Sequence, residues 1–400
     1  MLRLVGLVGL VFFLFIAWLM SENRRVVPWR LMAWALGLQF ILAVLVLRTG
    51  LGDPFFAGVD AVVGVLTDAT MEGAQFVFGP IVTDAETGGM AFQVLPVIIF
   101  VASLSAILYH LRVIQLLVRG MAFLMRRTLK TSGAETFGAA LLIFLGIEST
   151  TAVRGYIQGM TRSEMCTLMT TFMATIAGSV MVVYANFGAA PGHLVAASLM
   201  SAPAAILISK LMVPETGTPQ TQDSGAIEVP VESHNVVDAA AQGAQEGLKL
   251  TLSIATMLIA FIGLVYLINL GFDAVVGMTF TAIMGYVFMP FALLMGVPWQ
   301  DAAAVGELLG TKTVLNEFLA YAALQDVIGA NGMDPRSAAI ATYALCGFAN
   351  PGSLGILIAG VTALVPERRV EVVQLGLKSF VGGTLAAFMT ASIAGVLIVD

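Results

Sequence analysis

Two glutamates stand inside otherwise apolar stretches of this 400-residue chain. Glu148 follows apolar residues and precedes a run of hydroxyls, and Glu317 lies in the run Asn-Glu-Phe. An ionisable group near the centre of a bilayer costs about 2.5 to 3.5 kcal/mol, so each carboxylate is a candidate functional group. Such a pair can accept hydrogen bonds from the hydroxyls or amides of a solute, or carry a proton. A structural role is the alternative, with Arg154 neutralising Glu148 and Lys312 pairing with Glu317.

Two apolar runs that surround candidate polar groups are interrupted in the middle. The run 338–365 contains Cys-Gly-Phe-Ala-Asn-Pro-Gly-Ser at 346–353, and an earlier run contains Ala-Thr-Ile-Ala-Gly-Ser at 174–179. A broken helix is tolerated at membrane depth only where the freed backbone groups face protein or a wet cavity. Paired interruptions in the two halves of a chain are typical of a secondary transporter's binding site. Asn350 and Ser353 would then offer side chains to a solute; a proline kink in an ordinary helix is the alternative.

The first break also offers oxygen ligands for an alkali cation. Thr175 can supply a hydroxyl, Ile176 a freed carbonyl, and Leu145 a carbonyl from the neighbouring predicted hairpin. These three residues are the candidate sodium site. The alternative is a Thr175 hydroxyl that bonds back to its own helix. No cofactor other than the coupling ion is predicted.

The composition is that of a polytopic membrane protein. Hydrophobic residues make up 58% of the chain and charged residues 11%, and the mean hydropathy is +0.94. These values exclude a soluble globule, and nothing suggests nucleic-acid binding. Cys166 and Cys346 lie in apolar runs, which predicts buried thiols rather than a disulfide or a metal pair. The run Leu4–Met20 lacks a small-residue cleavage pattern, so we predict a retained first helix.

Eight apolar runs are long enough to cross a bilayer, at 2–20, 30–49, 91–110, 164–187, 192–212, 249–270, 336–364 and 378–399. Three further stretches, 112–130, 133–160 and 279–324, are candidates for interfacial helices and re-entrant hairpins. Basic residues after the first and third spans place those loops in the cytoplasm, which puts both termini outside it. Residues 53–89 then form an external loop with one short amphipathic helix around Phe55–Leu66.

The two halves of the chain repeat one order of elements, with a hairpin, a broken span and a further span in opposite topology. The predicted fold class is an all-α polytopic membrane protein with eight transmembrane helices plus two opposed re-entrant hairpins, an inverted repeat and helices broken at mid-membrane. The predicted domains are N-terminal scaffold helices at 1–111 with the external loop 53–89, a first transport repeat at 112–212, a cytoplasmic linker at 213–235, a scaffold helix at 236–270, and a second transport repeat at 271–400.

Several short runs resemble the concentrative nucleoside transporters, the sodium- or proton-coupled nucleoside symporters. The resemblance covers almost the whole chain, from Asn-Arg-Arg at 23–25 to the end. Its most specific runs are Val-Pro-Trp at 297–299, Gly-Glu at 306–307, Thr-Lys-Thr-Val at 311–314, Asn-Glu-Phe at 316–318, Leu-Cys-Gly-Phe-Ala-Asn at 345–350 with the following Ser353, and Pro-Glu-Arg-Arg at 366–369.

The resemblance implies inward secondary active transport of nucleosides, coupled to a cation by an elevator-like alternating-access movement, and no enzymatic activity. It further implies a homotrimer that is a multi-pass protein of the inner (plasma) membrane. The substrate-binding set that it implies places Glu317, Asn350 and Ser353 on the ribose, Phe348 in the pocket lining, and Glu148 and Val180 toward the base, with Ile147, Ser149 and Asn316 beside them.

Two departures from the family pattern bear on specificity and coupling. The first hairpin reads Gly146-Ile147-Glu148, apparently one residue shorter than the family's Gly-Gln-Thr/Ser-Glu, and it lacks the Gln and hydroxyl that contact the base. Leu142 aligns with an Asn that sodium-coupled relatives carry in this hairpin. Loss of that ligand leaves an incomplete sodium cage and favours a proton as the coupling ion.

Three alternative functions remain open at this point. A symporter of the same fold could carry a different ribosylated or polar metabolite. An intramembrane enzyme could use the two carboxylates, although Glu148 and Glu317 lie in opposed hairpins with no His, Cys or second acid beside either. A passive channel is the third, but a channel does not need carboxylates at two gates that close on one site.

Overall fold

The structure is a computed structural model in which residues 2–84, 89, 91–145, 154–221, 233–329 and 332–398 are described. These residues contain helices and no strand. The elements are α1 (Leu2–Leu19), α2 (Trp29–Arg48), α3 (Gly52–Phe78), η1 (Gly79–Val82), α5 (Leu95–His110), α6 (Val113–Leu129), α7 (Gly133–Leu145), α9 (Arg154–Ile157), α10 (Arg162–Ala174), α11 (Gly178–Asn186), α12 (Pro191–Met212), α13 (Val236–Val276), α14 (Phe280–Leu294), α15 (Trp299–Val314), α16 (Glu317–Gly329), α17 (Pro335–Leu345), α18 (Pro351–Leu364), η3 (Pro366–Arg368) and α19 (Arg369–Leu397).

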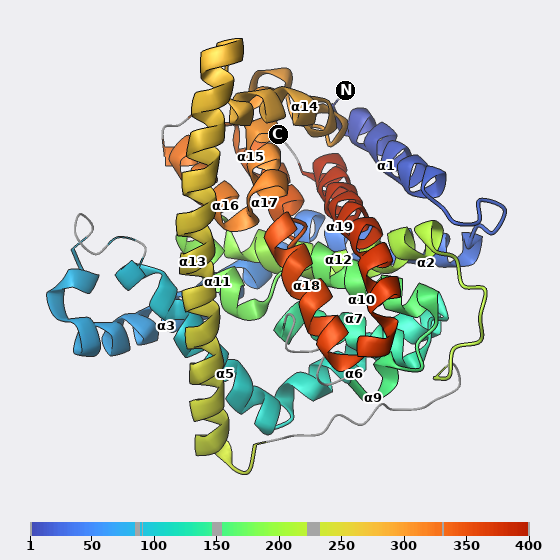
Figure 1. The fold of residues 1–400 in the computed structure, drawn as a ribbon, viewed down its shortest axis with the longest axis horizontal. Helices are drawn as coiled ribbons and strands as arrows, with labels where there is room; N and C mark the ends of the chain where they lie inside the picture. Colours follow the sequence, from blue (N-terminus) through green and yellow to red (C-terminus); the bar gives the residue numbers. More distant parts are fainter. Residues whose placement is uncertain are drawn as a thin grey trace.

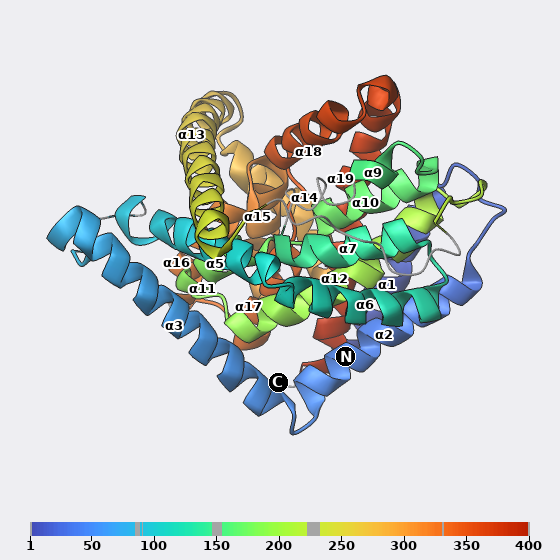
Figure 2. The ribbon, with the colours of Figure 1, turned by 90° about the horizontal axis from the view of Figure 1, so that it is seen from below.

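Eight segments of the described chain are long and apolar enough to cross a membrane, which confirms the predicted number. They are α1, α2, α3 with η1, the segment that ends with α5, α10 with α11, α12, α13, and η3 with α19. One of the eight differs from the predicted spans: α3 with η1 is among them, whereas the interrupted run 336–364 is not. The two chain termini lie near each other at one end of the molecule (Figures 1 and 2).

The prediction for residues 53–89 is wrong about the extent of helix. Instead of a loop with a short helix around Phe55–Leu66, α3 forms a continuous helix of 27 residues. The acidic residues and glycines that suggested a loop are interspersed with Ala, Val and Leu, and no proline follows Pro54 until Pro80, so nothing in between breaks the helix. α3 lies across the direction of α13, because Figure 2 shows α3 lengthwise and α13 nearly end-on.

Both predicted helix breaks are present. The backbone between α10 and α11 is extended, with ψ of 166° at Thr175 and 146° at Ala177. Residues 346–350 separate α17 from α18, so the predicted span 336–364 is two shorter helices. Pro351 stands in the first turn of α18, where its missing N–H interrupts no helical hydrogen bond. Asn350 caps that helix.

The core is formed by α10, α12 and α19, whose side chains are mostly buried, whereas α13 is largely exposed. α13 stands upright along one side of the molecule (Figure 1) and packs along α5. Two glycines of α13 permit this approach: a Cβ on Gly247 would lie 2.8 Å from Cα of Ile99, and one on Gly243 would lie 2.6 Å from Cβ of Ala106. A close, small-residue contact therefore joins α13 to its neighbour.

The stretches predicted to be hairpins and interfacial helices are helical. α15 and α16 pack against each other and meet at residues 315–316, which forms the second hairpin. α7 is the first arm of the other hairpin, and the tip at 146–153 lies outside the described residues. The stretch 112–130 is α6, and 279–296 contains α14.

A buried charge cluster fixes the beginning of the predicted linker against the helices. Nζ of Lys210 lies 2.8 Å from Oε1 of Glu135 and 3.3 Å from Oε2 of Glu215. The backbone N–H of Gly133 donates to the carbonyl of Thr221 at 3.0 Å. Residues 213–221 are therefore held in place, while 222–232 lie outside the described residues. The division into scaffold and transport domains stays a prediction.

Candidate solute-binding site

A pocket lies where the two helix breaks, the tip of the second hairpin and α13 meet. About 840 Å³ of space free of protein atoms lies between its walls, including the solvent at its open mouth. The lining residues are Phe172, Ala177, Val180 and Tyr184 from the first broken span, Leu250, Ser253, Ile254, Met257 and Phe261 from α13, Leu315, Asn316, Glu317 and Phe318 from the hairpin tip, and Phe348, Asn350, Gly352, Ser353 and Ile356 from the second broken span.

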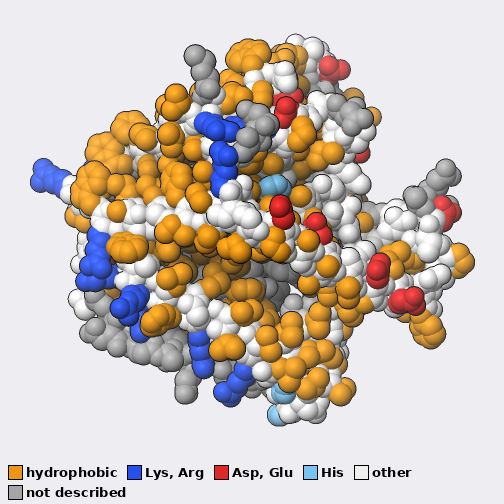
Figure 3. Space-filling view, turned by 180° about the vertical axis from the view of Figure 1, so that it is seen from behind, with side chains coloured by type: hydrophobic (Ala, Val, Ile, Leu, Met, Phe, Trp, Pro, Cys, Tyr) orange, Lys and Arg blue, Asp and Glu red, His pale blue; other side chains and the backbone are white. Residues whose placement is uncertain are grey.

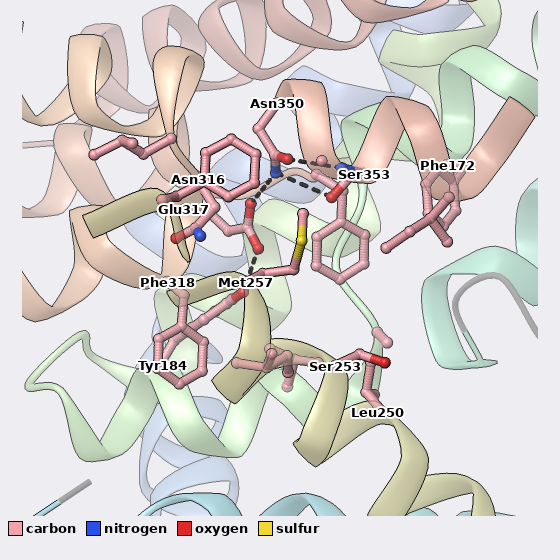
Figure 4. A pocket seen from close by; sticks show the side chains of 18 residues that line it. Phe172, Tyr184, Leu250, Ser253, Met257, Asn316, Glu317, Phe318, Asn350 and Ser353 are labelled. Carbon is pink, nitrogen blue, oxygen red and sulfur yellow. Dashed lines mark hydrogen bonds between the residues drawn. The ribbon is translucent and has the colours of Figure 1, made fainter. Parts of the chain in front are cut away.

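Glu317 is the buried charge at the centre of this pocket. Its Oε1 accepts a hydrogen bond from the Tyr184 hydroxyl at 2.8 Å, and its Oε2 accepts one from Nδ2 of Asn350 at 2.7 Å. Figure 4 shows the carboxylate between these two donors. A carboxylate has about four acceptor positions, so capacity remains for hydrogen bonds from a solute.

Lys312, the cation considered as a structural partner of Glu317, has a different hydrogen-bond partner. Nζ of Lys312 donates to the carbonyl of Ala344 at 2.8 Å. Ala344 lies in the last turn of α17, where carbonyl groups lack intrahelical partners. The alternative in which Lys312 is the structural partner of Glu317 is not seen as a hydrogen bond or ion pair: Lys312 donates instead to a carbonyl at the C-terminal end of α17.

Asn350 links the hairpin tip to α18. Its Nδ2 donates to Glu317 and also to Oγ of Ser353 at 3.0 Å, while its Oδ1 accepts from the Ser353 backbone N–H at 2.8 Å. The residue thus caps the helix and orients the carboxylate at the same time. A line of polar groups, Glu317, Asn350 and Ser353, results along one side of the pocket (Figure 4).

Much of the remaining lining is apolar and partly aromatic. The rings of Phe172 and Phe348 lie 5.6 Å apart, tilted by 40°. Val180 from α11 and Met257 from α13 line the same cavity. A pocket that combines linked polar groups with aromatic rings fits a solute that has a hydroxylated part and a flat ring.

The two helix breaks touch each other beneath the pocket. Gly347 has φ of +153°, and a Cβ placed on it would lie 2.9 Å from the carbonyl oxygen of Met173 and 3.0 Å from that of Ala174. These are carbonyls at the C-terminal end of α10. The second break therefore packs backbone to backbone on the first, at a position where a side chain does not fit.

Six of the predicted substrate-binding residues line this one pocket, and three lie outside the described residues. Val180, Asn316, Glu317, Phe348, Asn350 and Ser353 all line it. The Asn316 side chain also accepts from the Leu319 backbone N–H at 2.9 Å, so it caps the first turn of α16. Ile147, Glu148 and Ser149, at the first hairpin tip, are the three that the structure does not describe.

The candidate sodium ligands have mixed support. The Thr175 hydroxyl donates to the Thr171 carbonyl at 2.8 Å, which is the back-bonded arrangement that competes with a ligand role. Ile176 and Leu142 are completely buried, and Leu145 is partly buried. Among the described residues, no group of three or more His, Cys, Asp or Glu side chains could hold a metal ion. Thr175 and Ile176 lie beside the pocket without lining it.

The sequence analysis missed several contributors to the pocket, among them Phe172, Tyr184 and the wall from α13. Tyr184 is fully buried, stacks on Tyr321 with ring centroids 4.4 Å apart, and donates to Glu317. The spacing of four residues from Val180 could have found it, because the two share one face of α11. The pocket-lining residues of α13, which include Ser253 and Met257, could not have been found in this way, because nothing in the sequence of that helix distinguishes them from its other residues.

A pocket at the junction of two interrupted apolar helices and a hairpin is typical of the binding site of a secondary membrane transporter. Three family descriptions match the chain: "Na+ dependent nucleoside transporter N-terminus" at residues 8–81, "Nucleoside recognition" at 91–191, and "Na+ dependent nucleoside transporter C-terminus" at 193–395. The chain belongs to the concentrative nucleoside transporter family, whose members are transporters and not enzymes.

Named relatives and solved structures agree with this assignment. Solute carrier family 28 member 3 of Mus musculus is 40% identical, over 99% of this chain and 59% of its own length. The transporter YutK of Bacillus subtilis is 39% identical, over 98% of this chain and 99% of its own. The chain thus spans about three-fifths of the murine relative's length. CNTnw in an inward-facing substrate-bound state matches with a TM-score of 0.94 at 36% identity over 99% of both chains, which confirms the helical fold.

The contact between the two breaks gives a first prediction. We expect Gly347→Ala to lower the midpoint of thermal unfolding of the purified protein, because the added methyl meets two backbone carbonyls and the φ of +153° is strained for alanine. Gly355→Ala is the matched control, since a Cβ at Gly355 in α18 meets nothing within 4 Å, and it should raise the midpoint slightly. Equal behaviour of the two variants would contradict the backbone contact.

Proposed function

We propose that this protein carries nucleosides inward across the membrane, coupled to a cation. The observation that carries the proposal is the lining of one pocket: it combines the linked side chains of Glu317, Asn350 and Ser353 with the aromatic rings of Phe172 and Phe348. A nucleoside has the same division, with a hydroxylated ribose at one end and a flat base at the other. The matched family is one of nucleoside transporters.

The polar side of the pocket suits a ribose. Glu317 can accept hydrogen bonds from two neighbouring ribose hydroxyls, because each carboxylate oxygen keeps an acceptor position beyond the bond it makes to Tyr184 or Asn350. The Ser353 hydroxyl can donate to, or accept from, a further sugar oxygen. Hydrogen bonds to an ionised group are stronger than neutral ones, which assigns the greater part of sugar recognition to Glu317.

The apolar side suits a base. Phe348 and Phe172 offer aromatic surface to a flat ring, and Val180 and Met257 fill the space around it. Ser253 of α13 adds a hydroxyl to this wall. We assign Glu148, Ile147 and Ser149 to the base-facing tip of the first hairpin. A different ribosylated metabolite would use the same sugar contacts and differ in how it fills the aromatic side.

The sugar site predicts the effect of two substitutions. Glu317→Gln and Asn350→Ala should each reduce uridine uptake by about 10- to 100-fold, the size expected for losing a hydrogen bond to a charged group. The measurement is radiolabelled uridine uptake by proteoliposomes that contain equal amounts of folded protein. Asp326→Asn is the control, because this substitution makes the same acid-to-amide change at an exposed residue of α16. Wild-type rates in either site variant would show that the ribose binds elsewhere.

The hydrogen bond that Tyr184 donates to Glu317 gives a separate prediction. Tyr184→Phe removes one donor to Glu317, and we expect the KM for uridine uptake to rise about tenfold, since a misoriented carboxylate binds the sugar less well. Tyr321→Phe is the matched control: its hydroxyl donates to the Thr342 carbonyl at 2.8 Å and does not line the pocket. An equal rise of KM in both variants would point to a general packing role for the stacked tyrosines.

Further parts of the proposal concern the assembly and its movement. We propose a homotrimer in the inner (plasma) membrane with both termini outside the cytoplasm, in which the pocket-bearing helices move past the scaffold. CNTnw has been observed in inward-facing and outward-facing states, which supports alternating access in this fold. The large exposed surface of α13 fits the proposed homotrimer. The closeness of the two termini fits their proposed location on one side of the membrane.

The coupling ion in this proposal is a proton rather than sodium. Leu142 is completely buried and supplies no side-chain oxygen, and the hydroxyl of Thr175 is directed to its own helix. Each oxygen that replaces a hydration water adds to the affinity for an alkali cation, so the remaining ligands form a weak cage. Glu148, placed beside apolar residues in the first hairpin, is the proposed proton carrier.

Vesicle experiments separate the two ions. Uridine uptake should be accelerated by an inward proton gradient without sodium, and should respond little to a sodium gradient at fixed pH. Glu148→Gln, which removes the carboxylate, should abolish the response to the proton gradient. Uptake driven by sodium alone, together with an active Glu148→Gln variant, would show that the sodium cage is complete and that Glu148 serves the substrate or the structure.

A further inference from the structure

The helix α6 presents three different faces. Its buried face carries Ile114, Val118, Met125 and Leu129, which pack against the protein. The rest of the helix is exposed, and it is divided lengthwise into a basic strip and an apolar strip. This division carries an inference about what covers the exposed side.

The basic strip consists of Arg112, Arg119 and Lys130, with Arg127 beside it. Arg112 and Lys130 flank α6 in left-handed conformations, with φ of 63° and 55°, and Arg119 and Arg127 lie on the helix between them. All four side chains are exposed. None makes a hydrogen bond through its side chain or an ion pair with another described residue, and α6 contains no acidic residue.

The apolar strip is equally exposed. Val113, Leu117 and Leu124 follow one another at helical spacing, at 43%, 52% and 51% exposure. Leu116, which is 72% exposed, and Phe123, which is 60% exposed, lie between Arg119 and Arg127 around the helix. Large apolar side chains beside a row of unpaired cations are the pattern of a helix that rests at a bilayer surface, with its apolar strip among acyl chains.

The position of α6 in the fold agrees with a location at the bilayer surface. It begins three residues after His110, where the apolar segment of α5 ends, and it leads into the first hairpin arm α7. Figure 3 shows basic side chains among apolar ones along the left and lower edges and in a group above the centre, with acidic side chains at the top and to the right, including the arm that α3 forms.

We propose that α6 is a binding surface for the phosphate head groups of anionic phospholipids, with Arg112, Arg119, Arg127 and Lys130 as the contacts. The basic strip supplies the charge complementarity, and the apolar strip holds the helix at the depth of the head groups. The surface lies between the α5–α13 pair and the hairpin, so lipid bound there holds the segment that connects them.

A fluorescence experiment tests which lipid lies against α6. Leu116→Trp is introduced into protein whose four tryptophans have been replaced by Phe, and the protein is placed in vesicles of phosphatidylcholine and phosphatidylglycerol. Either the neutral or the anionic lipid is brominated, so that it quenches tryptophan on contact. We expect brominated phosphatidylglycerol to quench more at equal mole fraction, since each basic residue at the surface enriches anionic lipid locally by about fivefold.

Charge reversal and its matched control complete the design. Arg119→Glu with Arg127→Glu should make quenching by the two lipids equal, and Arg119→Lys with Arg127→Lys should keep the preference. Native-tryptophan protein gives a second measurement: the phosphatidylglycerol that co-purifies from mixed vesicles should fall in the reversed variant. The proposal would be overturned by equal quenching by the two lipids in the unreversed protein, or by a preference for phosphatidylglycerol that survives charge reversal. It would also be overturned if neither lipid quenched, as expected if a protein partner or a second copy covers α6. The readouts need no transport, so they stand apart from the proposed function.

Discussion

The buried carboxylate of Glu317 is the constraint on which the rest of the structure depends. An ionised group without water is destabilising unless donors surround it. The two donors, Tyr184 and Asn350, come from α11 and α18, the second halves of the two broken helices. Asn350 stands at the start of α18, whereas Tyr184 lies in the last turn of α11. The break before α18 thus places one of the two donors beside the carboxylate.

Each break in turn leaves backbone groups that need partners, and polar side chains nearby supply them. Asn350 caps the start of α18, and Lys312 donates to Ala344 at the end of α17. Gly347 lets the second break rest directly on the carbonyl ends of α10. Residues that bind or surround the proposed solute therefore also stabilise the interrupted helices.

The parts of the site that could be predicted from the sequence are those where a residue type is out of place. A Pro and two Gly in a long apolar run, or a Glu between apolar residues, conflict with an ordinary span. The second helix break was predicted from the Pro and Gly, and the first from the interruption at Gly178 and Ser179. Tyr184 sits in an apolar helix, where an aromatic residue reads as core, and its partner lies 133 residues away. α3 was misjudged because its acidic residues suit a helix lying on a surface as well as they suit a loop.

α13 gives the pocket a wall that differs from the others. The remaining lining comes from the broken spans and the hairpin tip, which are joined by hydrogen bonds, whereas α13 contributes Leu250, Ile254 and Met257 through apolar contact. A Cβ on Gly352 would lie 2.7 Å from Cε of Met257, so a flexible side chain closes this seam. Contacts without directional bonds can be exchanged as helices slide, and the hydrogen-bonded elements would travel with the solute as one body. The division of the pocket into a bonded part and an unbonded wall is therefore what the proposed movement requires.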